Sequence, residues 1–123
     1  MPSKKSTSYR DLEVWQKAIL LAKVIYELTD KFPSREIYGL SNQLRRGAVS
    51  IASNIAEGQA HSSRKEFQYF LNISLGSIAE LETQLTIAQA VAYMSEEALE
   101  KLLSPSDELT RMIKGLLKHL AGQ

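Results

Sequence analysis

The sequence predicts an all-α protein, an antiparallel up-down-up-down four-helix bundle, and three observations support this fold class. Apolar residues recur at intervals of three and four in four separate segments, which is the spacing of one face of an α-helix. The connections between these segments are short, as expected for helices that pack beside their sequence neighbours. No segment alternates apolar and polar residues between hairpin turns, so no β-sheet is predicted.

The first helix is expected to run from about residue 8 to residue 31. Ser8 and Asp11 have the spacing of a helix start, and Pro33 stops the helix because proline disfavours helical backbone in the residue before it. Twelve of the 17 residues from Leu12 to Leu28 are apolar. This apolar face is wider than a bundle core needs, so the helix is expected to be central or to contact another subunit.

After a short turn at residues 33–38, the second helix is expected to cover residues 40–57. Ser41 is expected to cap its start and Gly58 to end it. The apolar stripe of this helix contains Leu40, Leu44, Ala48, Ile51 and Ile55. A polar stripe elsewhere on the helix contains Arg46, Ser50, Ser53 and Glu57.

The third helix is expected to begin after the capping box formed by Ser63 and Glu66 and to reach about residue 92. The fourth helix opens at Ser95, which is followed by acidic residues that favour a helix N-terminus. Pro105 lies inside its apolar pattern and removes one backbone donor. The fourth helix is therefore expected to be kinked near Pro105 or, as the alternative, to stop and restart there.

Composition indicates a flexible basic tail at residues 1–8 and a single domain at residues 9–123. The net charge is +1, and there are no cysteines, no signal peptide and no membrane-spanning run, so a cytoplasmic protein is expected. Residues 1–65 carry eleven Lys or Arg and six Asp or Glu (net +5), whereas residues 66–123 have a net charge of −4. This asymmetry indicates either pairing between the two halves or a basic interaction face.

The sequence contains no catalytic or metal-binding pattern that we can recognise. His61 and His119 do not follow a glutamate at the Glu-x-x-His spacing of di-metal bundles, and the glycines lack phosphate-loop spacing. We therefore predict no catalytic residues, cofactor, metal or small-molecule substrate. The carboxylates of Glu57 and Glu80 are expected to pair with Arg46 between helices, and Asn54 to form a buried polar contact that sets helix register. Acid–base chemistry by these carboxylates, with Glu82, is the less favoured alternative.

A basic patch is the one candidate binding surface. Arg45, Arg46, Arg64 and Lys65 form its centre, with Lys4, Lys5, Arg10 and Lys17 as further members. Such a patch would bind RNA or DNA phosphates without reading base sequence. Arg64 and Lys65 stand in the first turn of a helix, where the dipole disfavours cations, and this placement favours a use for them. An ordinary solvated face is the alternative, and we favour it.

Several blocks of the sequence resemble a bacterial family of four-helix-bundle proteins. They are Tyr9–Ala18, Phe32-Pro33, Tyr38–Arg46, Val49–Gly58 and Gly76–Glu82, and the block Asn54-Ile-Ala-Glu-Gly58 is the most specific. The family includes proteins encoded by intervening sequences in 23S rRNA genes. The chain departs from the family pattern at Gly47, commonly Ala, and at Pro105. More distantly, it is similar to the accessory proteins of diversity-generating retroelements, which engage nucleic acid through a basic surface.

The resemblance implies a small cytosolic bundle that assembles as a ring-like homopentamer and has no enzymatic activity. The wide apolar face of residues 12–28 agrees with self-assembly. The leading prediction is therefore a non-enzymatic homo-oligomer. A nucleic-acid-binding accessory protein, using Arg45, Arg46, Arg64 and Lys65, is the alternative.

Overall fold

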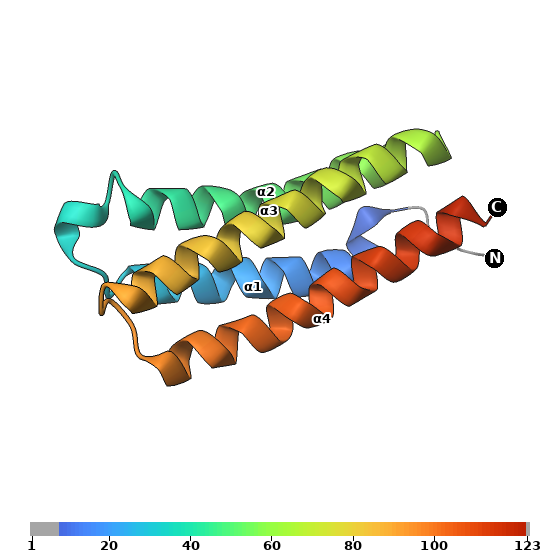
Figure 1. Cartoon of the computed structure of the whole chain (residues 1–123). Coiled ribbons are helices and arrows are strands. Elements are labelled where there is room, and N and C mark those ends of the chain that lie inside the picture. The colour runs from blue at the N-terminus through green and yellow to red at the C-terminus, as the bar shows by residue number, and fades with distance from the viewer. Residues whose placement is uncertain (1–7, 123) are drawn as a thin grey trace.

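The computed structural model describes residues 8–122, and within them it confirms the predicted all-α four-helix bundle. Each helix contacts its sequence neighbours, and α4 closes the bundle against α1. Figure 1 shows the C-terminal end of α4 and the α2–α3 turn at one end of the bundle, and the α3–α4 turn at the other. The elements are the 3₁₀ turns η1 (Tyr9–Asp11) and η2 (Ser34–Glu36) and the helices α1 (Glu13–Thr29), α2 (Leu40–Ala60), α3 (Arg64–Ala90) and α4 (Glu96–Ala121).

The core lies where the helical periodicity placed it. On α2, Leu44, Ala48, Ile51 and Ile55 are all buried, as the predicted stripe requires. The other helices contribute fully buried side chains at the same three- and four-residue spacing: Ile25, Leu71, Ile78, Leu81, Leu85, Leu109 and Ile113. Hydrophobic burial of these faces stabilises the bundle.

The first helix starts later than the sequence indicated. Ser8 does act as a cap, because its hydroxyl accepts a hydrogen bond from the Arg10 amide at 3.1 Å, but it caps η1 and not α1. Leu12 is extended and separates the two elements. The Gln16 side chain donates to the Arg10 carbonyl at 2.8 Å and ties this turn to α1. The predicted cap was correct, and the element assigned to it was wrong.

Both ends of α2 also differ from the prediction. Ser41 is buried inside the helix. The N-cap residue is Gly39, which has no side chain with which to cap the helix. The Glu36 side chain caps the helix, because its Oε1 accepts a hydrogen bond from the Leu40 amide at 2.9 Å. Gly58 does not end α2, which continues to Ala60.

The predicted serine caps of α3 and α4 are confirmed, whereas in the predicted capping box of α3 the Glu66 carboxylate contacts His61 Nδ1 at 3.3 Å. Ser63 accepts from the Glu66 amide at 3.1 Å, and Ser95 accepts from the Ala98 amide at 3.0 Å. Between them, α3 ends in a Schellman motif in which the Tyr93 amide donates to the Ala88 carbonyl at 2.8 Å. Ala92 holds the left-handed position of this motif, with φ of 68°, where glycine is the usual residue.

Helix α4 runs without interruption through Pro105, so the predicted stop and restart does not occur. Pro105 and Lys101, whose carbonyl loses its helical donor, both lie on the exposed side of α4. None of the helices within residues 8–122 has the length and apolar content needed to cross a bilayer. Residues 1–7 of the predicted basic tail lie outside the described part of the chain.

Candidate functional site

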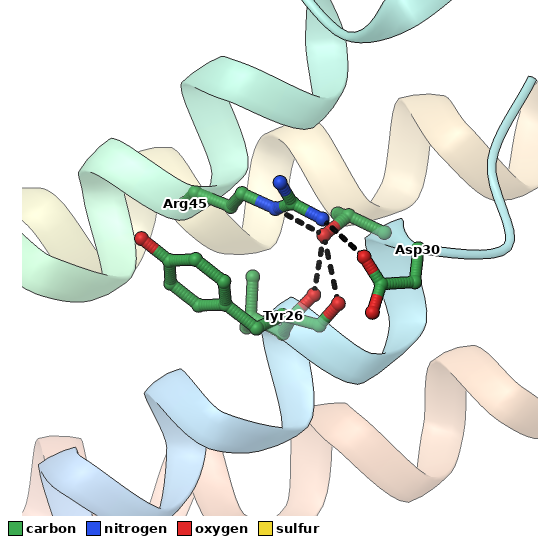
Figure 2. A network of polar contacts seen from close by, with 5 residues as sticks. Tyr26, Asp30 and Arg45 are labelled. Carbon is green, nitrogen blue, oxygen red and sulfur yellow. Dashed lines mark hydrogen bonds and ion pairs between the residues drawn. The ribbon is translucent and has the colours of Figure 1, made fainter. Parts of the chain in front are cut away.

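Arg45, a central member of the predicted basic patch, joins α1 to α2 (Figure 2). Its Nε donates to the Thr29 hydroxyl at 2.7 Å, and its Nη2 contacts the Asp30 carboxylate at 2.8 Å. The guanidinium also lies 4.9 Å from the centre of the Tyr26 ring, in cation–π geometry. Thr29 in turn donates to the Ile25 carbonyl at 2.8 Å. The charge of Arg45 is therefore neutralised at the C-terminal end of α1, where a cation is favourable.

Arg46, one residue further on, points elsewhere and is exposed. Among the described residues it forms no ion pair with Glu57 or Glu80, which are also exposed, so the predicted interhelix pairing is not formed. Asn54 donates to the Ser50 carbonyl at 2.8 Å and hydroxyl at 3.1 Å, within α2 itself. The contact that crosses to α3 is the hydrogen bond between the hydroxyls of Ser50 and Ser77 at 3.0 Å.

Two further polar contacts between helices involve serines that the apolar pattern conceals. The buried Ser74 hydroxyl donates to the Ile51 carbonyl at 2.9 Å, joining α3 to α2. The buried Ser106 hydroxyl donates to the Glu82 carboxylate at 2.5 Å, joining α4 to α3. Both serines lie three or four residues from buried apolar residues of their own helix, and this spacing is the feature of the sequence that indicates their burial. The carboxylate of Glu82 is thus engaged in helix packing.

The α1–α2 connection is held to the α3–α4 turn by a second polar cluster. The Tyr93 hydroxyl donates to Glu36 Oε2 at 2.7 Å, and the Phe32 ring lies 5.4 Å from the Tyr93 ring. The hydrogen bonds from the Leu40 amide and the Tyr93 hydroxyl hold the pKa of Glu36 below its usual value. The hydrogen bond to Glu36, with burial, raises the pKa of Tyr93. The cluster explains which residue caps α2.

The four basic residues of the predicted patch are not brought together. Because α2 rises about 1.5 Å per residue, the stretch from Arg46 to Ala60 separates Arg46 from Arg64 by roughly 20 Å along the bundle. Arg64 and Lys65 are exposed at the α2–α3 turn, and neither forms an ion pair within residues 8–122. Of the further members, Lys17 contacts Glu108 at 3.7 Å.

Three aromatic side chains, His61, Tyr69 and Phe70, belong to the α2–α3 turn and to the first two turns of α3. The His61 ring stacks on the Phe70 ring with 5.4 Å between centroids and 4° between planes. The Tyr69 ring meets the Phe70 ring edge-on at 5.1 Å, and 62% of Tyr69 is exposed. The Glu66 carboxylate contacts His61, with 3.3 Å between Glu66 Oε1 and His61 Nδ1. We call His61, Arg64, Lys65 and Tyr69 the basic–aromatic surface.

A second surface is apolar and lies mainly on α1. We call it the α1 band, and it consists of Ile19 (41% exposed), Leu20 (61%), Val24 (41%) and Tyr26 (44%) on α1 and Val49 (45%) on α2. Leu20 and Val24 also line a groove of about 170 Å³ against Leu102 and Pro105 of α4. The band has two parts, because helical spacing places the exposed residues Lys23 and Glu27 between them: Leu20 and Val24 lie on the α4 side, and Ile19, Tyr26 and Val49 on the α2 side. Groups of large exposed apolar side chains are typical of interaction surfaces, whereas single ones are common on any protein.

Comparison with known proteins identifies the family. The model of the 23S rRNA-intervening sequence protein family matches residues 10–115. The chain belongs to this family. A solved structure from Bacteroides thetaiotaomicron, a protein with unknown function from the S23 ribosomal protein family, is similar to it with a TM-score of 0.80 and 27% sequence identity. The match covers 85% of this chain and 95% of that chain. A search of curated proteins found no match.

In this member of the 23S rRNA-intervening sequence protein family, Glu36, Arg45 and Glu82 serve contacts between structural elements. Within residues 8–122, no three His, Asp or Glu side chains lie close enough together to hold a metal ion. The two groups whose pKa values are displaced, Glu36 and Tyr93, are partners in the cluster that caps α2. The α1 band and the basic–aromatic surface are two described surfaces suited to contact with other molecules.

Proposed function

We propose that this protein is a non-enzymatic cytosolic assembly protein that binds copies of itself and forms a ring-like homopentamer. The α1 band is the observation that carries this proposal. Each of its five side chains is at least 41% exposed, and burial of apolar area is the main favourable contribution to most protein association. A second copy is an occupant of suitable length, because α1 can pack against another helix along several turns.

The outer face of α2 and α3 supports the same proposal. Among the exposed residues in ranges 42–60 and 69–90, Arg46, Glu57 and Glu80 are the charged ones. The exposed side of α4 is very different and carries Glu96, Glu97, Glu100, Lys101, Asp107, Glu108, Arg111 and Lys114. Depletion of charge is characteristic of the centre of protein interfaces, so the α2–α3 face is suited to receive another subunit.

Two different surfaces suited to contact favour a ring. When one surface of a subunit binds a different surface of the next subunit, the contact is heterologous and closes into a ring if the rotation allows it. The α1 band and the α2–α3 face would supply the two sides of such a contact. A ring of five is what the family resemblance of the sequence implies.

Size-exclusion chromatography with light scattering tests the proposal. The wild-type protein is expected at about five times the 13.8 kDa mass of one chain at micromolar concentration. The double variant Leu20→Glu/Val24→Glu is expected to elute as a folded monomer, because both residues are exposed in one chain and a charge there would be buried at the interface.

Ile37→Glu is the matched control, since Ile37 is 54% exposed but lies in the connection before α2, outside the α1 band. It is expected to keep the wild-type mass, and circular dichroism should show native helix content for both variants. A wild-type protein that is monomeric under these conditions would overturn the proposal. So would a double variant that keeps the oligomeric mass.

A further inference from the structure

The α2–α3 turn combines unpaired cations with exposed rings. Arg64 and Lys65 form no ion pair within the described chain, and both are exposed in the first turn of α3. That position is unfavourable for cations because of the helix dipole, so these residues cost folding stability where they stand. The nearest acid in the sequence, Glu66, is already in contact with His61. No carboxylate of the described residues lies within ion-pair distance of Arg64 or Lys65, and together with Glu66 this first turn of α3 carries a net charge of +1.

The rings beside these cations are held in place by contacts within the bundle. Phe70 lies over Gly58 of α2, where an added Cβ would be 2.8 Å from the Phe70 Cβ. His61 stacks on one side of Phe70, and Tyr69 meets its edge. Tyr69 follows Lys65 by four residues, so the two side chains are neighbours on the same face of α3, with Cβ atoms about 6 Å apart. The result is an exposed ring next to an exposed cation on a fixed support.

We propose that single-stranded nucleic acid binds this basic–aromatic surface, with Arg64 and Lys65 contacting phosphates and Tyr69 and His61 stacking on bases. This function is additional to self-assembly. Sequence-tolerant binding of single strands uses this combination of positive charge along the backbone and aromatic faces for the bases. A duplex hides the faces of its bases, and an acidic peptide would satisfy the cations but leave the rings unused.

The other cationic region of the bundle does not have this property. Arg45 is already bound by Thr29 and Asp30 and covers one side of the Tyr26 ring. Arg46 is exposed and lines a hollow with Tyr26 and Arg45, but the Arg45 charge there is already paired with Asp30. The α2–α3 turn is therefore the better candidate. Of the four basic residues predicted from the sequence, the proposed site keeps Arg64 and Lys65 and adds the rings of His61 and Tyr69.

The experiment measures binding of the full-length protein to a fluorescein-labelled oligouridine of about 20 nucleotides by fluorescence anisotropy over a series of salt concentrations. Arg64→Glu/Lys65→Glu is expected to weaken binding at least tenfold and to reduce the salt dependence by about 1.4 in slope, the value for two lost phosphate contacts with a single strand. Arg111→Glu/Lys114→Glu is the matched control, because it changes the net charge equally on the exposed side of α4. It is expected to change affinity less than threefold.

Tyr69→Ala separates base stacking from charge. It is expected to weaken oligouridine binding about fivefold to tenfold and to leave the salt slope unchanged, because no cation is removed. Polyglutamate and a duplex of the same length serve as competitors, and both are expected to compete poorly. The proposal is overturned if wild type does not bind at low salt or if the two charge variants behave alike. Equal competition by polyglutamate or by the duplex, or an unchanged affinity in Tyr69→Ala, also overturns it.

Discussion

The two ends of the bundle use the same kinds of residue in opposite ways. At the end where α1 connects to α2, Arg45 is bound to Asp30 and Tyr26, and Arg35 lies 5.9 Å from the centre of the Tyr93 ring. At the other end, Arg64 and Lys65 stand beside His61 and Tyr69 without an ion pair among the described residues. A cation next to an aromatic ring is therefore not by itself a binding site. What distinguishes Arg45 from Arg64 and Lys65 is that a carboxylate of the same chain, that of Asp30, already pairs with its charge.

The largest expected effect on stability comes from adding a methyl group at Gly58, against which Phe67 and Phe70 of α3 pack. In Gly58→Ala, the new Cβ would lie 2.8 Å from the Phe70 Cβ and 3.0 Å from the Phe67 ring. Overpacking of this kind costs about 1–3 kcal/mol, offset in part by about 1 kcal/mol of better helix propensity. We expect a net loss of up to about 2 kcal/mol in the free energy of unfolding, measured by urea denaturation.

Gly76→Ala is the control for this substitution. Nothing lies within 4 Å of the added Cβ at Gly76, so the propensity gain should appear alone, as an increase of about 1 kcal/mol. If both alanine variants stabilise the protein, the close contact at Gly58 does not constrain the helix pair.

The next largest effect tests whether Arg45 holds the opposite end together. Arg45→Met keeps the aliphatic stem but removes the contacts with Thr29 and Asp30, and we expect a loss of about 1 kcal/mol because Asp30 is largely exposed and its attraction is screened. Arg46→Met is the neighbouring control and should change stability by less than about 0.5 kcal/mol. Equal effects of the two variants in urea denaturation would show that Arg45 has no special structural part.

Glu36 predicts how this same end responds to acid. Its pKa is lowered from the ordinary 4.5, so its carboxylate adds stability above that pH, and the contribution is lost as pH falls through the lower value in the folded state. Glu36→Gln should therefore be less stable than wild type near pH 7, with a difference that shrinks as the pH falls below 4.5. Parallel curves of unfolding free energy against pH would contradict this assignment.

The smallest effect is expected from the α2–α3 cations. Arg64→Ala and Lys65→Ala should each raise the unfolding free energy by about 0.3 kcal/mol, because each removes a positive charge from the start of a helix. Thermal unfolding of the two variants checks this. A loss of more than about 1 kcal/mol in either variant would mean that the cation supports the fold, and the contrast between the two ends would disappear.

The sequence was sufficient to predict the four helices, because their buried faces repeat at helical spacing over many turns. It was less informative about helix ends. Ser41 looks like a cap by position, yet the donor at the start of α2 is satisfied by Glu36, four residues before Leu40. Gly58 looks like a terminator, but its small size serves contact with Phe70, a residue of the next helix. In both cases the deciding partner is brought close by the fold and is not marked by local pattern.

The candidate binding residues were predictable only in part for a similar reason. Arg45 and Arg46 are adjacent in sequence but are separated by about 100° around the helix axis, so Arg45 faces the end of α1 and Arg46 faces solvent. Arg45 and Arg64 were grouped in the predicted patch, but the length of α2 between them places them far apart along the bundle. The unfavourable position of Arg64 and Lys65 at a helix start was visible in the sequence, and this signal led to the surface that we now propose.

The antiparallel path of four helices has a practical consequence for any engineered version of the protein. An even number of passes returns the chain to the end at which it began, so the C-terminal end of α4 lies at the same end of the bundle as the α2–α3 turn (Figure 1). A polyhistidine tag or fused domain after α4 would stand at the end of the bundle that carries the basic–aromatic surface, where it would add charge or block access. A circular permutant opened between α3 and α4 would place its new termini at the opposite end and leave that surface clear.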